Sequence, residues 1–406
     1  MSTNRLRGSA TETELALFET EDHRTFDGAS PHFKTPVEIG SFSLDINREF
    51  ENSQKSMRYF IKPSNPGEVN FDLRKGYDTM IKNEQGRKLD VLRWIVENVE
   101  KFPIKGRGET KGQNFGVSGR DRPKKDQKNS ASSLSQHSKG KSKGDKELTD
   151  VQTGLSKMMI SKEDDLKRCA PANMSAVGKL RNLNTDFVCR RGLLAKIMCT
   201  PYEKMENWLI AVTLHNGTYY LDEVETEERK ENEERIKNDE MCAWGWKFEQ
   251  YLTSVFFGEV DALNVDKEKG SYYVEFKTNR EITHPGHEKT FKRLKIKKWW
   301  SQSYIMGVQE IVCGFRDENG VVHKLEFYNT NDLPNLAEDL YNPWKPNVCL
   351  NFLDQFLSFI KSTITTDDKR IVHTLKWSPG EPVRCSQPLV DSEYNFLPEW
   401  YTDAVK

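Results

Sequence analysis

Two short stretches of the chain alternate charged with apolar residues, and they lie close together in the sequence. The first reads Gly-Glu-Val-Asp-Ala-Leu from residue 258, and the second reads Tyr-Val-Glu-Phe-Lys from residue 273. Because alternate residues of a β-strand share a face, Glu259 and Asp261 are predicted on one face of the first strand. By the same rule, Glu275 and Lys277 share a face of the second strand. Paired side by side, these strands would gather three carboxylates and one ammonium on one surface.

Carboxylates grouped in this way suit a hard divalent cation. Mg²⁺ is usually held by a few carboxylates together with water and substrate phosphate. A nearby ammonium can orient the attacking water or stabilise the phosphate. Acid-x-acid on one strand and Glu-x-Lys on the next therefore predict a metal-dependent phosphodiesterase. The alternative is two amphipathic strands whose charged faces meet water.

The residues before these strands predict a helix over 241–252. Trp244, Phe248 and Tyr251 are spaced for one buried helical face. Glu249 lies beside that aromatic stripe, so it is either a partnered structural carboxylate or a further metal ligand.

The residues after the strands predict a second helix over 288–306, rich in basic residues and followed by a tryptophan pair. Basic side chains beside aromatic ones suit a nucleic-acid strand, through phosphate contacts and base stacking. A solvated helix would look much the same. His284 and His287 are predicted to be turn residues in a loop before this helix. The basic residues are Lys289, Lys292, Arg293, Lys295, Lys297 and Lys298.

The other apolar patterns predict a mixed α/β or α+β domain. Helices are expected over 84–102 and 348–363, and strands over 187–202 and 371–377. Hairpins are expected around Asn216-Gly217 and around Asn319-Gly320, because Asn-Gly between apolar runs is a strong turn signal. An aromatic anchor is expected at 396–401.

The amino-acid composition limits the classes of protein to which the chain can belong. Its 406 residues are 36% hydrophobic and 30% charged, with no apolar run near the ~20 residues that a membrane span requires. We therefore expect no membrane partner. The seven cysteines are scattered without a CxxC motif, which predicts reduced thiols in the cytosol or nucleus. Of these two locations, we expect the nucleus.

Two segments are predicted to lack fixed structure. Residues 1–36 are polar and are expected to form a mobile N-terminal tail. Residues 105–146 carry twelve Lys and Arg against four Asp and Glu, with almost nothing apolar. Such a stretch is expected to be a disordered linker or a basic arm that binds RNA. The predicted domain is thus 37–104 with 187–401, interrupted by a basic insertion over 105–186.

Eleven short motifs in a fixed order closely resemble the decapping exoribonuclease family of eukaryotes. The resemblance covers roughly 37–104 and 187–401. The motifs are FSLD at 42–45, RG at 191–192, TPYE at 200–203, EVET at 223–226, KFEQY at 247–251, GEVD at 258–261, VEFKT at 274–278, KWWSQS at 298–303, VC-x-NF at 348–352, LSF at 357–359 and FLP-x-WY at 396–401.

The resemblance implies a PD-(D/E)xK-like nuclease fold, two divalent ions (Mg²⁺ or Mn²⁺) and an RNA 5′ end in the cleft. Members of this family remove incomplete caps, NAD caps or 5′ triphosphates in RNA quality control, and some also degrade RNA 5′→3′. When the family's roles are transferred to the matching motifs, the metal ligands would be Glu249, Glu259, Asp261, Glu275 and the carbonyl of Phe276. The residues that contact RNA or the scissile phosphate would be Arg48, Arg191, Gly192, Glu259, Lys277 and Gln302.

Three departures from the family pattern leave rival hypotheses open. Arg190 stands where the family usually has Trp, and Gly86 stands where an acidic residue is expected. Glu249 and Glu259 are ten positions apart, whereas relatives usually place a strand and a loop between them. The leading hypothesis is an RNA 5′-end hydrolase with exoribonuclease activity. The rivals are a catalytically weakened binding partner of a larger 5′→3′ exoribonuclease, and a DNA nuclease.

Overall fold

The computed structural model describes ten stretches of the chain, and every structural statement below concerns them. The stretch Lys105–Arg168 is a separate unit and lies outside them. The predictions for the basic insertion and for the short connection before Glu259 therefore fall almost wholly outside the described residues. The described residues are 14–20, 22–45, 49–77, 89–102, 170–171, 182–226, 239–253, 261–266, 268 and 270–405.

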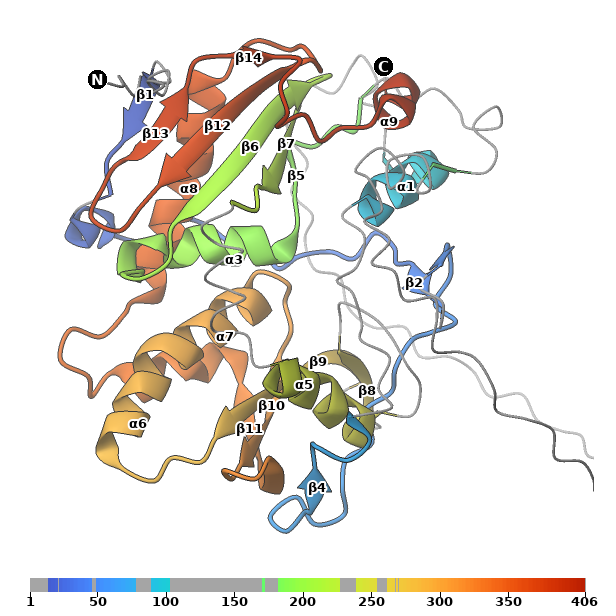
Figure 1. Cartoon of the computed structure of the whole chain (residues 1–406), viewed down its shortest axis with the longest axis vertical. Helices are drawn as coiled ribbons and strands as arrows, with labels where there is room; N and C mark the ends of the chain where they lie inside the picture. Colours follow the sequence, from blue (N-terminus) through green and yellow to red (C-terminus); the bar gives the residue numbers. More distant parts are fainter. Residues whose placement is uncertain are drawn as a thin grey trace, which may run out of the picture. The chain divides into compact units, whose positions relative to one another are not determined.

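A seven-stranded sheet is built around the predicted hairpin of β6 (Trp208–His215) and β7 (Thr218–Glu223) (Figure 1). Asn216 and Gly217 connect these strands with φ of 51° and 75°, the left-handed backbone that a tight hairpin turn requires. The strand order is β1-β13-β12-β6-β7-β5, and β14 pairs with β12. The other strands are β1 (Glu14–Phe18), β5 (Phe187–Val188), β12 (Ile371–Trp377), β13 (Val383–Ser386) and β14 (Leu389–Val390).

A five-stranded sheet contains the second of the two stretches that carry the predicted chemistry, in β9, and the last two residues of the first stretch, in β8. Its order is β4-β11-β10-β9-β8. Strands β8 and β9 pair antiparallel with Ala262 opposite Val274, so the predicted pairing is confirmed. Strand β9 runs parallel to β10. The strands are β4 (Phe71–Asp72), β8 (Ala262–Asp266), β9 (Gly270–Arg280), β10 (Glu310–Arg316) and β11 (Val321–Asn329); a small separate sheet pairs β2 (Ser43–Leu44) with β3 (Phe50–Glu51).

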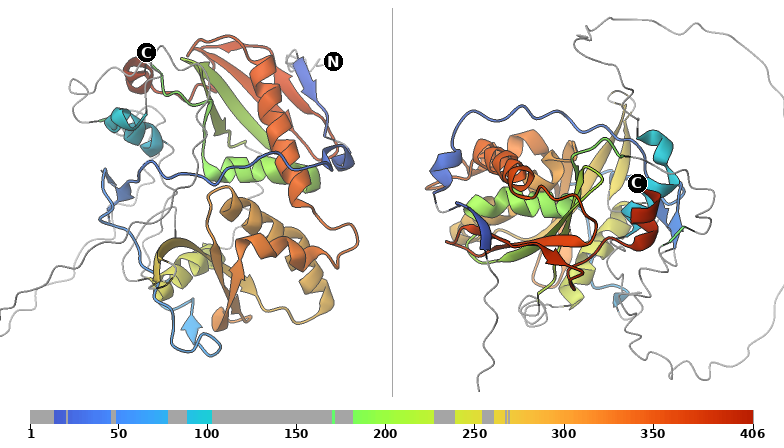
Figure 2. Two further views of the ribbon diagram at one scale, coloured as in Figure 1. Left: turned by 180° about the vertical axis from the view of Figure 1, so that it is seen from behind. Right: turned by 90° about the horizontal axis from the view of Figure 1, so that it is seen from above.

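Helices cover both faces of the five-stranded sheet and one face of the larger sheet. The aromatic residues of α5 pack on one face, and α7 packs on the other. Helices α3 and α7 lie between the two sheets (Figure 1), and α8 covers the larger sheet (Figure 2). The helices are α1 (Asp90–Glu97), α3 (Arg191–Cys199), α5 (Asp239–Leu252), α6 (Pro285–Thr290), α7 (Ile296–Tyr304), α8 (Pro346–Thr363) and α9 (Glu399–Ala404); 3₁₀ turns span His23–Phe26, Val99–Lys101, Thr200–Tyr202 and Thr330–Ala337, and Phe291–Lys295 is π-helical.

The architecture confirms the predicted α+β class with mixed sheets and most of the predicted elements. The hairpin around Gly320 is confirmed as β10 and β11, and the helix over 348–363 is confirmed as α8. Of the helix predicted over 84–102, the described residues 89–102 form α1, which ends at Glu97, and a 3₁₀ turn that follows it. No helix in the described part of the chain has the length and apolar character needed to cross a lipid bilayer.

Three predictions about local structure are wrong. Residues 187–202 are not a long strand, because after β5 the run RGLLAKIMC forms α3, with Leu193 and Ile197 one turn apart and both buried. His287 is not in a loop but within α6, which His284 caps. The predicted mobile tail is ordered over residues 14–20 and 22–36: β1 pairs with β13, and Phe26 joins the core.

The contact between α5 and β10 gives a first test of the packing. A Cβ at Gly314 would lie 2.4 Å from Cε2 of Phe248, so Gly314→Ala should destabilise the protein by about 1–3 kcal/mol. The matched control is Gly245→Ala within α5, where nothing lies within 4 Å of the added Cβ. That change should stabilise the helix by about 0.5–1 kcal/mol. Urea unfolding of both variants measures the two effects, and equal effects of one sign would contradict this packing.

Candidate active site

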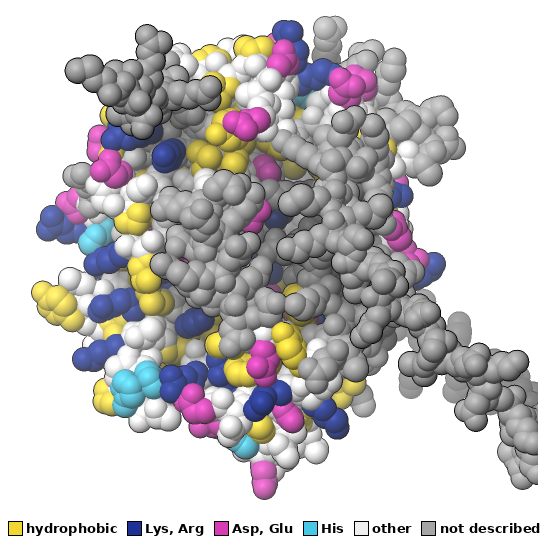
Figure 3. Space-filling view, in the orientation of Figure 1, with side chains coloured by type: hydrophobic (Ala, Val, Ile, Leu, Met, Phe, Trp, Pro, Cys, Tyr) yellow, Lys and Arg dark blue, Asp and Glu magenta, His cyan; other side chains and the backbone are white. Residues whose placement is uncertain are grey.

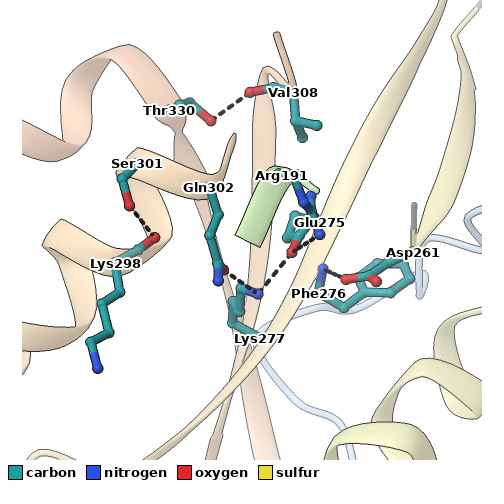
Figure 4. Close-up of polar contacts among 10 residues, drawn as sticks. All are labelled: Arg191, Asp261, Glu275, Phe276, Lys277, Lys298, Ser301, Gln302, Val308 and Thr330. Atoms are coloured by element: carbon teal, nitrogen blue, oxygen red, sulfur yellow. Dashed lines mark hydrogen bonds and ion pairs between the residues drawn. The ribbon is translucent and has the colours of Figure 1, made fainter. Parts of the chain in front are cut away.

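Glu275 is the centre of the site. Its carboxylate is 2% exposed and receives two cations, one from α3 and one from its own strand. Nη1 of Arg191 lies 2.8 Å from Oε2, and Nζ of Lys277 lies 2.8 Å from Oε1 (Figure 4). Burial alone would raise the pKa of Glu275, but the charges and hydrogen bonds of Lys277 and Arg191 outweigh it and lower that pKa. Glu275 is therefore held as a carboxylate.

Lys277 links this carboxylate to α7. Its ammonium also donates to Oε1 of Gln302 at 3.3 Å. The prediction that Glu275 and Lys277 share one face of the strand is thus confirmed. Gln302 of α7 is the third polar residue of this hydrogen-bonded group. Gly192 follows Arg191 in the first turn of α3, so these site residues come together from β9, α3 and α7.

Asp261 lies immediately before β8 and reaches the backbone of the neighbouring strand. Its Oδ2 accepts the N–H of Phe276 at 2.6 Å. Burial, followed by the charges of Glu275 and Glu249, raises the pKa of Asp261 well above its usual range. Asp261 is therefore a buried carboxyl that lies within the influence of two other carboxylates, and its ionised form is unfavourable unless further positive charge is present.

Glu249 projects from α5 and has a partner that the sequence did not reveal. Nη1 of Arg58 lies 2.5 Å from Oε2 of Glu249, and the Arg58 side chain is 8% exposed. Burial raises the pKa of Glu249 although the charge of Arg58 opposes the shift. Glu249 is therefore one partner of a buried ion pair and not a free carboxylate at the surface.

The backbone around Arg58 closes the edge of the five-stranded sheet. The carbonyl of Arg58 accepts the N–H of Leu263, and the N–H of Phe60 donates to the Leu263 carbonyl. The N–H of Ile61 donates to the carbonyl of Leu252, the last residue of α5. This segment therefore ties the end of α5 to β8 beside the site. The only sequence signal for Arg58 was a single charge within the run Met-Arg-Tyr-Phe.

The structure brings together most, but not all, of the predicted site. Arg48 and Glu259 lie outside the described residues. Phe276 gives its N–H to Asp261 while its ring packs in the core on the opposite face, against Phe248. The predicted residues that the structure places at the site are Arg191, Gly192, Glu249, Asp261, Glu275, Phe276, Lys277 and Gln302.

The donor set fits a divalent cation. Within the described stretches, no three Asp, Glu, His or Cys side chains converge into a ready-made metal site. The cations of Arg58, Arg191 and Lys277 instead hold two of the carboxylates. Oxygen-only donors in a desolvated, like-charged cluster are nevertheless the ligands that Mg²⁺ and Mn²⁺ prefer.

A cavity of about 140 Å³ opens beside this cluster, between α3 and α7. Gly192 and Gln302 line one part of it, so the cavity adjoins the residues predicted to contact phosphate. Its other walls mix acidic, basic, neutral polar and apolar side chains. They are Ala195, Lys196, Cys199, Thr200, Glu203, Glu206, Asn207, Trp208, Lys298 and Ser301.

Comparison with known proteins identifies the family. The family model described as "RAI1 like PD-(D/E)XK nuclease" matches residues 34–117, 119–256 and 254–402. The chain belongs to this family. Among relatives in this family, the "Decapping and exoribonuclease protein" of Xenopus laevis is 30% identical, over 94% of this chain and 89% of its own length.

Solved structures share the fold of this family. Scheffersomyces stipitis Rai1, in complex with (3'-NADP)+ and calcium ion, matches with a TM-score of 0.64 at 18% identity, over 92% of this chain and 97% of its own. Candida albicans Rai1, in complex with pU5-Mn2+, matches with a TM-score of 0.61 at 17% identity, over 96% and 98%. The fold implied by the sequence motifs is therefore confirmed.

Proposed function

We propose that this protein is a divalent-metal-dependent hydrolase of RNA 5′ ends. It would remove incomplete caps, NAD caps or the pyrophosphate of a 5′ triphosphate, and then degrade RNA 5′→3′. The observation that carries this proposal is the assembly of Glu275, Lys277 and Gln302 beside Asp261 in a PD-(D/E)XK nuclease. The relative named as a decapping exoribonuclease and the Rai1 complexes with pU5-Mn2+ and (3'-NADP)+ support it.

The carboxylates would hold the metal. Two ions are proposed, with Mg²⁺ or Mn²⁺ as the species. When bound, such ions supply positive charge at the phosphate and make water acidic enough to act as a nucleophile near neutral pH. The proposed ligands are Glu249, Glu259, Asp261, Glu275 and the carbonyl of Phe276.

The remaining polar residues would hold the RNA. Lys277 has three N–H donors, of which Glu275 and Gln302 take two among the described residues, so the third can reach a phosphate oxygen. The amide group of Gln302 can donate to the same phosphate. Arg191, Gly192 and Arg48 are proposed to contact RNA phosphates, and Glu259 to contact the substrate as well as metal.

The two rival hypotheses are less favoured. A weakened binding partner would have no need of the ion-pair network that holds Glu275 ionised against burial. A DNA nuclease is disfavoured by membership of the RAI1-like family. Nuclear localisation and association with a larger 5′→3′ exoribonuclease stay as proposals.

A panel of defined RNAs tests the proposal. Purified protein is incubated with RNAs ending in NAD, GpppN, a methylated cap or a triphosphate, and with a matched DNA, in Mg²⁺, Mn²⁺ or chelator. We expect 5′-monophosphate RNA and the released cap or pyrophosphate, with no product in chelator. Undiminished product in chelator, or cleavage of DNA with no cleavage of any RNA, would contradict the proposal.

A further inference from the structure

One side of α7 and of the π-helical turn before it carries a row of polar residues that leads away from the catalytic cluster. Lys295, Lys298 and Gln302 are spaced three and four residues apart, so they share one side of the helix. Figure 4 shows the side chains of Lys298 and Gln302 extending in the same direction from α7, with the Gln302 amide meeting Lys277. Successive members of the row are separated by about 4.5–6 Å along the helix axis.

The two lysines of this row have positive neighbours and little to neutralise them. Lys295 is exposed, yet desolvation by the surrounding protein, followed by the charges of Lys298, Arg316 and Lys277, lowers its pKa. No described residue forms an ion pair with Lys295. Lys298 lies 3.4 Å from Glu206, and both side chains are about half exposed, so this contact is weak and a phosphate can replace it.

The helix itself is shaped to expose this row. The π-helical turn Phe291–Lys295 lets Phe291 and Ile296 both reach the core while Arg293, Leu294 and Lys295 between them face solvent. Figure 3 shows Lys and Arg side chains gathered over the part of the surface that α6 and α7 form, at lower left. The two tryptophans of α7 are buried, so this side offers charge without an aromatic surface for base stacking.

We propose that Lys295 and Lys298 bind the sugar–phosphate backbone of RNA nucleotides downstream of the hydrolysed phosphate. This inference rests on the proposed function, since the row begins at Gln302. Gln302 and Lys298 line the cavity between α3 and α7, and Lys295 lies one turn beyond them on exposed surface. The row therefore continues past the cavity, which suits a continuing chain better than a compact cap. Contacts of ammonium groups to phosphates carry no sequence preference, so this surface would lengthen the footprint on any single-stranded RNA.

The binding of RNAs of different lengths tests whether Lys295 and Lys298 contact downstream nucleotides. The Asp261→Asn protein serves as the background, and fluorescence anisotropy measures its affinity for a dinucleotide and a decamer across a salt series, each RNA carrying either a 5′-monophosphate or a 5′-triphosphate. Adding Lys295→Gln and Lys298→Gln should weaken decamer binding by about tenfold and make the salt slope less negative by about 1.4, since about 0.7 is lost per single-strand phosphate contact. Dinucleotide affinity should change far less. The matched control Lys376→Gln removes an exposed charge on β12 and should change neither affinity nor slope.

Three results would overturn the inference. These are an unchanged decamer slope, equal losses for dinucleotide and decamer, and a loss seen only with a 5′-triphosphate, which would assign the lysines to the cap. The proposed function fails separately. If wild-type protein binds the decamer with the expected salt slope but hydrolyses no 5′ end, the proposed hydrolase function is contradicted, while the proposed RNA-binding role of Lys295 and Lys298 still stands.

Discussion

Replacing Asp261 with asparagine should remove nearly all hydrolysis while making the metal-free protein more stable. The carboxylate is a proposed metal ligand, and loss of even an outer-shell partner of a metal site typically costs 10–100-fold, so we expect a fall of more than about 100-fold. The asparagine carbonyl can still accept the N–H of Phe276. Removing a charge that lies near Glu275 and Glu249 should stabilise the metal-free fold by about 0.5–2 kcal/mol.

Thermal unfolding in chelator and in Mn²⁺ separates these two effects. Wild-type protein should gain stability when Mn²⁺ is added, and the Asp261→Asn protein should gain much less. Asp354→Asn on the exposed side of α8 is the matched control and should change neither activity nor stability. Turnover close to wild type, or a variant less stable than wild type in chelator, would refute this role for Asp261.

Replacing Arg58 with methionine should destabilise the metal-free protein by about 3–5 kcal/mol, the usual cost of leaving one partner of a buried ion pair uncompensated. Arg58 is 8% exposed and Glu249 is 20% exposed, so solvent can do little to replace the lost charge. The double variant Arg58→Met with Glu249→Gln should regain most of that stability, because neither charge then remains.

Urea unfolding in chelator measures the complete double-mutant cycle. The control is Arg24→Met, since Arg24 pairs with Asp22 at 2.9 Å on the surface with 80% of its side chain exposed. That variant should unfold as wild type does. If Arg58→Met is no more destabilising than Arg24→Met, or if the double variant is no better than the single one, the buried pair does not support the site.

The parts of the site that the sequence predicted are those set by local periodicity. A strand's alternation puts Glu275 and Lys277 on one face, and a helix's period places Glu249 beside the aromatic stripe of α5. Asn-Gly turns located both hairpins in the same way. Each of these predictions depends only on residues that are close together in the sequence, which explains why the structure confirms them.

The parts that the sequence did not predict depend on distant partners. Arg58 and Glu249 are separated by 191 positions, and nothing near Arg58 marks it as half of a buried pair. The strand β1 is a short apolar run within an otherwise polar stretch, and it pairs with β13 from the far end of the chain, so the stretch could be mistaken for a tail. Residues 191–199 fit a strand or a helix by apolar content, and packing of α3 against α7 decides between them.

The most direct test of the proposed metal centre is anomalous scattering from crystals grown with Mn²⁺. We predict anomalous density adjoining the carboxylates of Asp261 and Glu275, and a strong loss of that density in Asp261→Asn crystals of the same form. Absence of density there at a Mn²⁺ concentration that supports RNA hydrolysis in solution, or density only at a different part of the protein, would contradict the assignment of this cluster as the metal centre.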